Sequence, residues 1–524
     1  MRLPSLTAIL FCLLLLLNLT YIWLQAYFLT SDGPAHVHNA ALLNHWLHGN
    51  DASFLQQFYA LHLQAEPNWF THAVLLLLQQ FFSPIVSEKL LVSLYALLFP
   101  LSLWYTGKQF NKDAGLSLLL FPLSFHFLLY YGFYNYCLGI TFAIFFIGLW
   151  QQLRSSRYSI QVLCFVPMTM LVYLTHILGW LLIAVVLGGI FLLELLQAIR
   201  SKQLFLMRST LLRHWAVLVF CGAVPVVLSL LFVRNHTSEI QYYPQTVHDL
   251  WQAFISLQVL HIFTPVEISL TLVYIVLLAS LLGYILVQRL RTRTFLAADG
   301  FLLAVPIFLV LYLWQPVALS MAGFWIGRMS WLPWLLLACW LGTQTFPKRI
   351  TSVVSVVVAA LTIGFWYVRL PYQQRLSAAE ADYLSAIPYI TEQSVILPLS
   401  FAHGGIDENG ASIAPERKFF LHAFDYCGTD KPVINLANFE ATTSWFPLNW
   451  KTGTDPQNQL GNFESFPGTT ALTAYNNYPG RRPVDFVVTW CMPAQPGPIL
   501  TDLQNGYGRV YTSATGRTMV WKKK

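Results

Sequence analysis

Long apolar runs separated by short polar stretches dominate this chain. The runs are roughly 15 to 27 residues long, and a helix needs about 20 apolar residues to cross a bilayer. Only 10% of the residues are charged, whereas a soluble domain carries about 25%. We therefore expect an all-α polytopic membrane domain of about 11–13 transmembrane helices. The candidate runs lie near 4–29, 68–82, 88–106, 114–131, 134–151, 159–175, 177–198, 214–233, 266–288, 299–315, 325–343 and 350–368.

The charged residues divide the chain into two parts. Residues 1–369 hold 18 Lys and Arg but 10 Asp and Glu, whereas residues 370–524 hold 12 and 13. The first part is the predicted membrane domain, and the second is long enough to form its own core. Apolar strands "SVILPLS" and "VDFVVTW" and the hairpin pattern "GRVYTSATGRTMVWKK" predict a small α/β domain there.

Basic residues mark alternate connections and so set the predicted orientation. The positive-inside rule places these connections in the cytoplasm, which leaves loops 30–67 and 234–265 and the domain 370–524 outside. We expect the first run to be a retained helix, because its apolar core is too long for a signal peptide. Twelve full crossings would put both termini on one side, so we expect one run, 68–82, not to cross fully. The basic connections are Lys108 and Lys112, Arg154 and Arg157, Arg200 to Arg213, Arg289 to Arg293, and Lys348 and Arg349.

Neither the net charge nor the cysteines indicate a further function. The charge of +7 comes mostly from the basic connections and does not predict nucleic-acid binding. No cysteines have the spacing of a metal cluster. Cys427 and Cys491 could form a disulfide only if their domain lies in an oxidising compartment.

Asp32 stands where the first predicted helix ends, in "SDGPAHVHNAALLNHW". Partial desolvation there would raise the pKa of the carboxyl group towards that of a useful base. An acid before Gly-Pro is also an ordinary helix N-cap. The sequence leaves both roles open.

The first external loop and its end supply further polar candidates. His36 and His38 are two residues apart, so they do not share a helical face. Glu66 is a second acid, a metal ligand or a solvated loop charge, and Asn68 and His72 follow it in "EPNWFTH". Histidine and carboxylate side chains could together bind zinc or manganese. No tight ligand spacing supports this, so we assign no metal ligand.

Three more candidates lie at predicted external helix ends. Asn135 belongs to "YYGFYNYCLGI", and His176 separates two apolar runs as a cap or a cavity-lining group. Arg328 lies on the side that is poor in basic residues. Ionisable groups at membrane depth are costly and mark function, and arginine is a strong phosphate ligand. Snorkelling to the interface is the alternative for Arg328.

The whole arrangement resembles the C-type glycosyltransferases, which include protein O-mannosyltransferases, the lipid A aminoarabinose transferase and oligosaccharyltransferase. The shared features are a first helix, an Asp just outside it, about a dozen helices and an external α/β domain. The stretches "DGPAHVHNAALL", "EPNW", "NFEATTSWFPLNW" and "YTSATGRTMVWKK" look like a group of bacterial multi-pass proteins related to this superfold. The resemblance covers nearly the whole chain in architecture, but its motifs are specific only in these stretches.

The resemblance implies an enzyme of the bacterial inner membrane that moves a sugar from a polyprenyl-phosphate-linked donor. The acceptor would be an extracytoplasmic glycan, lipid or protein. Asp32 would be the catalytic base. Known members usually carry paired acids, whereas this chain has "SDGPAH" and only Glu66 to serve as a second acid. No cofactor is certain, and magnesium or manganese would be the divalent metal. The predicted substrate-binding residues are His36, His38, Asn68, His72, Asn135, His176 and, for the lipid phosphate, Arg328.

Three other functions are compatible with the sequence. A non-catalytic envelope scaffold would use the external domain to bind a partner. A transporter or flippase of a lipid-linked glycan would need polar residues at mid-membrane depth, and few apolar runs contain any. A polysaccharide polymerase or ligase would share the donor but use different acids.

Overall fold

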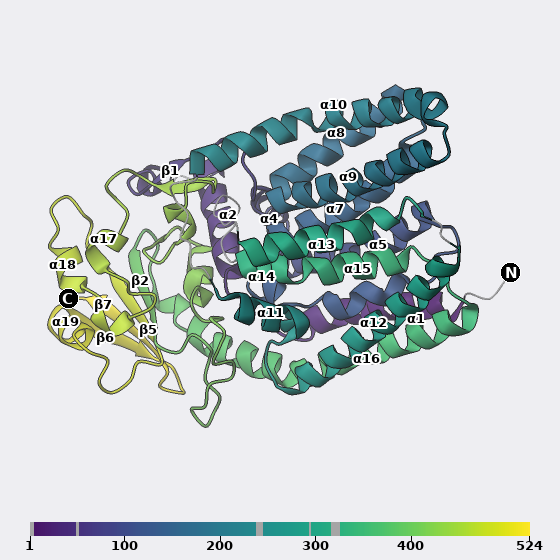
Figure 1. The fold of residues 1–524 in the computed structure, drawn as a ribbon. Helices are drawn as coiled ribbons and strands as arrows, with labels where there is room; N and C mark the ends of the chain where they lie inside the picture. The colour runs from purple at the N-terminus through teal and green to yellow at the C-terminus, as the bar shows by residue number, and fades with distance from the viewer. Residues whose placement is uncertain (1–4, 49–51, 237–244, 293–294, 316–324) are drawn as a thin grey trace. The chain divides into compact units, whose positions relative to one another are not determined.

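A computed structural model describes residues 5–48, 52–236, 245–292, 295–315 and 325–524 (Figure 1). The chain forms two compact units. Unit 1 comprises Met1–Tyr21, Ser93–Leu129 and Tyr134–Arg369. Unit 2 comprises Ile22–Val92, Tyr130–Phe133 and Leu370–Lys524, so the predicted loop 30–67 belongs to the same unit as the C-terminal residues.

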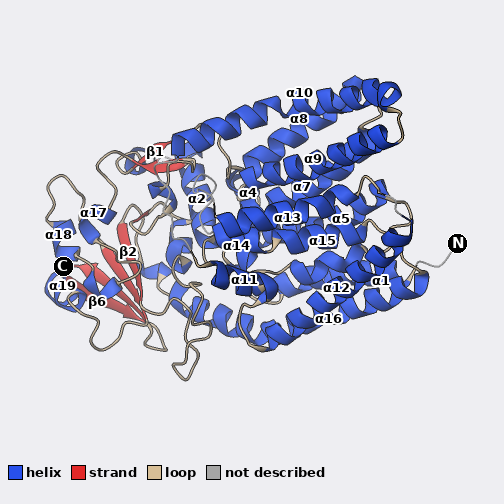
Figure 2. Cartoon of the chain, viewed as in Figure 1, coloured by secondary structure: helices blue, strands red, loops and turns tan. Residues whose placement is uncertain are grey.

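Unit 1 is helical (Figure 2). Helix α7 packs against α8 and α9, and α13 packs against α9 and α15. Helices α5 and α16 also contribute residues to unit 2. The helices are α1 Leu6–Trp23, α5 Pro84–Phe110, α6 Phe127–Tyr130, α7 Tyr134–Leu153, α8 Tyr158–Thr175, α9 Ile177–Arg200, α10 Leu204–His236, α11 Val247–Ile255, α12 Val266–Thr292, α13 Asp299–Trp314, α14 Trp325–Ser330, α15 Leu332–Gly342 and α16 Lys348–Leu384, with 3₁₀ helices η1 Ser117–Leu123 and η3 Gln258–Leu260.

Within the described residues, 8 helices are long and apolar enough to cross a membrane. They are α1, α5, α7, α8, α9, α10, α12 and α16. The chain is thus a multi-pass membrane protein, as expected. Part of the predicted loop 234–265, residues 237–244, lies outside the described residues.

Several predicted runs form shorter elements than expected. The run 114–131 contains the 3₁₀ helix η1 and the four-residue α6 instead of one long helix. Pro122 lies inside η1, and proline cannot donate the backbone hydrogen bond that an α-helix needs. Helix α4 in the run 68–82 has 9 residues, about half the length of a full crossing. The run 325–343 is divided between α14 and α15.

Unit 2 combines short helices with two sheets, drawn in red in Figure 2. Its α-helices are α2 Gly33–His48, α3 Ala52–Leu55, α4 Phe70–Leu78, α17 Gln457–Leu460, α18 Leu472–Asn476 and α19 Ile499–Gly506. Its 3₁₀ helices are η5 Ile387–Tyr389, η6 Ala423–Gly428, η7 Glu440–Thr442 and η8 Pro467–Thr469. Its strands are β1 Tyr59–Leu61, β2 Val395–Ser400, β3 Ile434–Asn435, β4 Leu448–Trp450, β5 Phe486–Trp490, β6 Tyr507–Thr512 and β7 Thr518–Lys523.

The larger sheet has the order β3-β2-β5-β7-β6. Strand β2 is parallel to β3 and β5, whereas β7 is antiparallel to β5 and β6. The predicted strands and the predicted hairpin are therefore confirmed. Cys427 and Cys491 both carry free thiols, so they form no disulfide.

The smaller sheet pairs two segments that are distant in sequence. Strand β1 is antiparallel to β4, and Tyr59 lies opposite Trp450 with their rings stacked 4.7 Å apart. Leu42 and Leu43 of α2 share one hydrophobic cluster with Leu397. This shared core fixes α2 within the same unit as the C-terminal residues.

Candidate functional site

Asp32 directly precedes α2, which begins at Gly33. The backbone N–H of Asp32 donates to the carbonyl oxygen of Tyr131 at 3.0 Å, and its carbonyl accepts from the N–H of His36 at 3.2 Å. Gly132 has φ +94, and a side chain there would lie 2.7 Å from the backbone nitrogen of Gly33. Only glycine permits this close approach. Asp32 is 8% exposed, so it is held at a fixed, nearly buried position.

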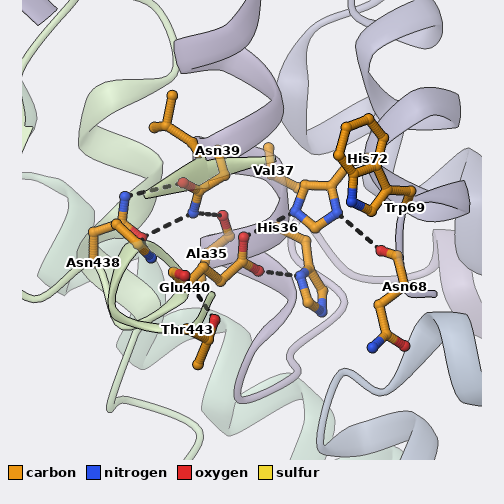
Figure 3. A network of polar contacts seen from close by, with 12 residues as sticks. Ala35, His36, Val37, Asn39, Asn68, Trp69, His72, Asn438, Glu440 and Thr443 are labelled. Carbon is orange, nitrogen blue, oxygen red and sulfur yellow. Dashed lines mark hydrogen bonds and ion pairs between the residues drawn. The ribbon is translucent and has the colours of Figure 1, made fainter. Parts of the chain in front are cut away.

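His36, His72 and Glu440 form a buried triad (Figure 3). His36 lies on α2, His72 on α4 and Glu440 at the start of η7. Nε2 of His72 lies 2.8 Å from Oε2 of Glu440, and Nδ1 of His36 contacts Oε1 of the same carboxylate. One atom from each residue lies within 4.8 Å of the others. Two imidazoles and a carboxylate could hold a metal ion.

In each imidazole, one ring nitrogen contacts Glu440 and is called the inner nitrogen here. The other, outer nitrogen faces a backbone carbonyl group. Nε2 of His36 lies 3.0 Å from the carbonyl oxygen of Gly132. Nδ1 of His72 lies 3.4 Å from the carbonyl oxygen of Asn68, which has φ +72. A carbonyl oxygen only accepts hydrogen bonds, so each outer nitrogen carries a proton. These contacts fix the orientation of both rings.

Electrostatics favours charge separation in the triad. Burial disfavours the ionised carboxylate, but the His72 and His36 imidazoles lower the pKa of Glu440 to about 2. Burial opposes the charge on His36, yet Glu440 and, to a smaller extent, Asp32 raise the pKa of that imidazole. The Asp32 carboxylate therefore lies within electrostatic reach of the triad.

An amide pair holds η7 against α2. The side chains of Asn39 and Asn438 exchange two hydrogen bonds of 3.0 Å, and Asn39 also donates to the carbonyl oxygen of Ala35 at 2.9 Å. Figure 3 shows these bonds beside the triad. Because Asn438 is two residues before Glu440, the pair helps to position the carboxylate.

His38 and Glu66 lie in unit 2 but are not members of the triad. His38 is fully buried close to Gly428. Within the described residues neither of its ring nitrogens has a hydrogen-bond partner, and burial lowers its pKa to about 4. Glu66 is buried, and its Oε2 lies 3.3 Å from Nε2 of His62.

The remaining predicted site residues belong to unit 1. The rings of Tyr136 and His176 lie edge to face at 5.3 Å, and the Tyr136 hydroxyl donates to the carbonyl oxygen of Arg328 at 2.6 Å. Nδ1 of His176 accepts from the N–H of Leu178 at 3.1 Å, so His176 caps α9. Burial, and then the charge of Arg328, lower the pKa of His176 well below its usual range. Asn135, next to Tyr136, is buried. Substrate binding by these residues stays a prediction.

Sequence reasoning did not identify Glu440 or Asn438 as site residues. Both lie in "NLANFEATTSW", part of which indicated the family resemblance. The only feature of this stretch that could have indicated a site is Glu440, a single acid among small and apolar residues. It could not be connected to His36, because 404 residues separate the two.

Comparison with known proteins gives a structural likeness alone. No protein-family model and no curated protein sequence matches the chain. The fold is similar to that of ArnT. The crystal structure of ArnT from Cupriavidus metallidurans in the apo state covers 98% of this chain and 97% of that one, with 11% identity and a TM-score of 0.55. A structure of the same ArnT bound to undecaprenyl phosphate covers the same shares with 15% identity and a TM-score of 0.46. The expected fold, a helical membrane part with a small C-terminal α/β part, is thus confirmed.

Proposed function

We propose that this protein is a membrane glycosyltransferase that moves a sugar from a polyprenyl-phosphate-linked donor to an extracytoplasmic acceptor. The observation that carries the proposal is the likeness of fold to ArnT over nearly the full length of both chains. The resemblance drawn from the sequence points to the same class of enzyme. Fold alone does not define function, so the residues around Asp32 provide the second support.

Asp32 is the proposed catalytic base. Its carboxylate would take the proton of an acceptor hydroxyl while that oxygen bonds to the anomeric carbon of the donor sugar. The bond from the anomeric carbon to the phosphate oxygen breaks, and polyprenyl phosphate leaves. The fixed backbone around Asp32 and its position before α2 suit this role, because a general base needs a defined geometry. In unit 1, Arg328 stays the predicted ligand of the lipid phosphate.

Sugar transfer in proteoliposomes tests this proposal. The assay compares the wild-type protein with Asp32→Asn, using radiolabelled sugar on polyprenyl phosphate and several acceptors. We expect Asp32→Asn to lower the rate by about 10²- to 10⁴-fold, because the amide cannot accept the proton. Asp113→Asn is the matched control, since Asp113 is exposed and lies in unit 1.

Two results would contradict parts of the proposal. An unchanged rate in a stably folded Asp32→Asn variant would reduce Asp32 to a helix cap and move the search for a base to Glu66. No transfer from any donor to any acceptor would make the scaffold function the better explanation.

A further inference from the structure

We propose that His36, His72 and Glu440 bind a divalent transition-metal ion of the zinc class. All three residues are buried, at 5%, 1% and 0% exposure. They come from three separate elements, α2, α4 and η7, that belong to one unit. The bound ion would link α2 and α4 to the C-terminal segment of unit 2.

The outer hydrogen bonds of the imidazoles support this assignment. Metal-binding histidines almost always donate their second ring N–H to a carbonyl oxygen or a carboxylate. His36 does so with the carbonyl of Gly132, and His72 faces the carbonyl of Asn68. In a neutral imidazole the inner nitrogen then carries a lone pair. Both lone pairs are directed towards Glu440.

The carboxylate of Glu440 offers only acceptors to these two nitrogens. The inner nitrogens of neutral His36 and His72 and the carboxylate oxygens of Glu440 would therefore present lone pairs to one another at the centre of the triad. A cation at that point satisfies all three. One divalent ion can bind all three groups. Without a metal ion, hydrogen bonds to Glu440 from both rings would require an extra proton on each of the two buried imidazoles.

The donor set selects the class of metal. Two imidazole nitrogens and one carboxylate oxygen suit zinc and its neighbours, with ligand distances of about 2.0–2.2 Å. Magnesium and calcium prefer oxygen ligands alone. Three protein ligands leave one position for water or another oxygen ligand. The donor set therefore favours the zinc class over magnesium.

The surroundings supply the support that a metal site needs. The Phe446 ring lies 6.1 Å from the His36 ring and 5.2 Å from the His72 ring, so it provides an apolar wall. The paired amides of Asn39 and Asn438 hold the segment of Glu440 against α2. An apolar wall limits the access of water, and polar contacts beyond the ligands fix their orientation.

Metal analysis of the full-length protein tests this proposal independently of sugar transfer. The protein is purified in detergent without a polyhistidine tag, dialysed against buffer with micromolar zinc, and then against metal-free buffer. Mass spectrometry of the metal content should find one zinc ion per wild-type chain. We expect Glu440→Gln and His72→Asn to retain at least tenfold less. The control His48→Asn changes an exposed histidine of α2, the helix that carries His36, and should retain zinc as the wild type does.

Cobalt provides the readout that separates the site from surface binding. Replacement of zinc by cobalt in the wild type should give the visible absorption of a four-coordinate ion, and His48→Asn should preserve it. A wild-type protein that binds neither zinc nor cobalt would overturn the proposal, as would full retention by a folded Glu440→Gln variant. Loss of bound metal in His48→Asn would identify surface binding and would also overturn it. If the ligand variants do not fold, the metal content and cobalt spectrum of the wild type decide.

Discussion

Two buried charged networks in this protein differ in how their hydrogen bonds are completed. In unit 1, Nε of Arg369 lies 2.5 Å from Oε1 of Glu267, and its two terminal nitrogens donate to the carbonyl oxygens of Phe125 and Leu260 at 2.6 and 2.7 Å. Oε2 of Glu267 accepts three backbone N–H groups from residues 262–264. Each of the three Arg369 nitrogens therefore meets an acceptor within the network itself.

The triad of unit 2 is completed differently. His36 and His72 use their outer N–H groups on backbone carbonyls, and their inner nitrogens meet the oxygens of Glu440. In the site proposed above, a bound cation would join these nitrogens and oxygens. Loss of one partner from a fully paired buried network is strongly destabilising, whereas a metal site is stabilised by the ion that it binds.

The largest expected effect is the loss of one partner from the completed network. Arg369→Met leaves the Glu267 carboxylate buried without its cation, so the free energy of unfolding should fall by about 3–5 kcal/mol. Unfolding in mixed micelles followed by circular dichroism measures this change. The double variant Arg369→Met, Glu267→Gln should recover most of the loss. A single variant within about 1 kcal/mol of the wild type would show that the pair is not a stabilising network.

A smaller effect is expected when metal is removed. At free zinc about 100 times the dissociation constant, binding adds about 2.7 kcal/mol to the free energy of unfolding. A chelator should remove this increment from the wild type and leave Glu440→Gln unaffected. The Arg369 variant should lose the same increment as the wild type, because its network lies in unit 1. Equal melting temperatures with and without chelator in the wild type would contradict the distinction between the two networks.

The smallest effect concerns Glu464, a half-buried acid near Lys418. Burial raises the pKa of the Glu464 carboxyl to about 7, although the charge of Lys418 opposes this shift. The folded state therefore keeps a proton that the unfolded chain releases near pH 4.5, and stability falls as the pH rises from there to about 7. Because Glu464 is partly solvated, we expect Glu464→Gln to gain only about 1–2 kcal/mol above pH 7.

Unfolding of the Glu464→Gln variant and of the wild type at pH 5, 6, 7 and 8 measures the difference. The two curves should lie closest at pH 5 and separate further as the pH rises to about 7. Parallel curves would show that Glu464 is already ionised at pH 5 in the folded protein.

The sequence predicted regular elements well where local patterns determine them. The strands β2 and β5 and the hairpin of β6 and β7 follow from apolar runs and a glycine turn. The prediction that residues 114–131 form a single long helix was wrong. Residues 118–123 are buried within the protein, and a buried segment and a lipid-facing segment have the same apolar composition.

Two residues of the triad, His36 and His72, were among the substrate-binding candidates drawn from the sequence, and their role stays a prediction. The structure places His38 outside the triad, and the helical spacing had already separated it from the face of His36. Glu440 was missed, because no local pattern links it to α2, and its role depends on how the chain folds over several hundred residues. Local sequence patterns therefore predicted the helices and strands, but not the contacts between elements that lie far apart in the sequence.

The separation between His36 and Glu440 also affects biosynthesis. The histidine leaves the ribosome 404 residues before the glutamate, which at about 5–20 residues per second corresponds to roughly 20–80 s. Strand β1 likewise cannot pair until β4 has been synthesised. Throughout the synthesis of most membrane segments, α2 thus lacks its contacts with η7, and β1 lacks its partner strand β4. Assembly of unit 2 is therefore a late event in the maturation of this protein, and a chaperone acting on the nascent chain would meet the 30–61 segment in its unpaired state.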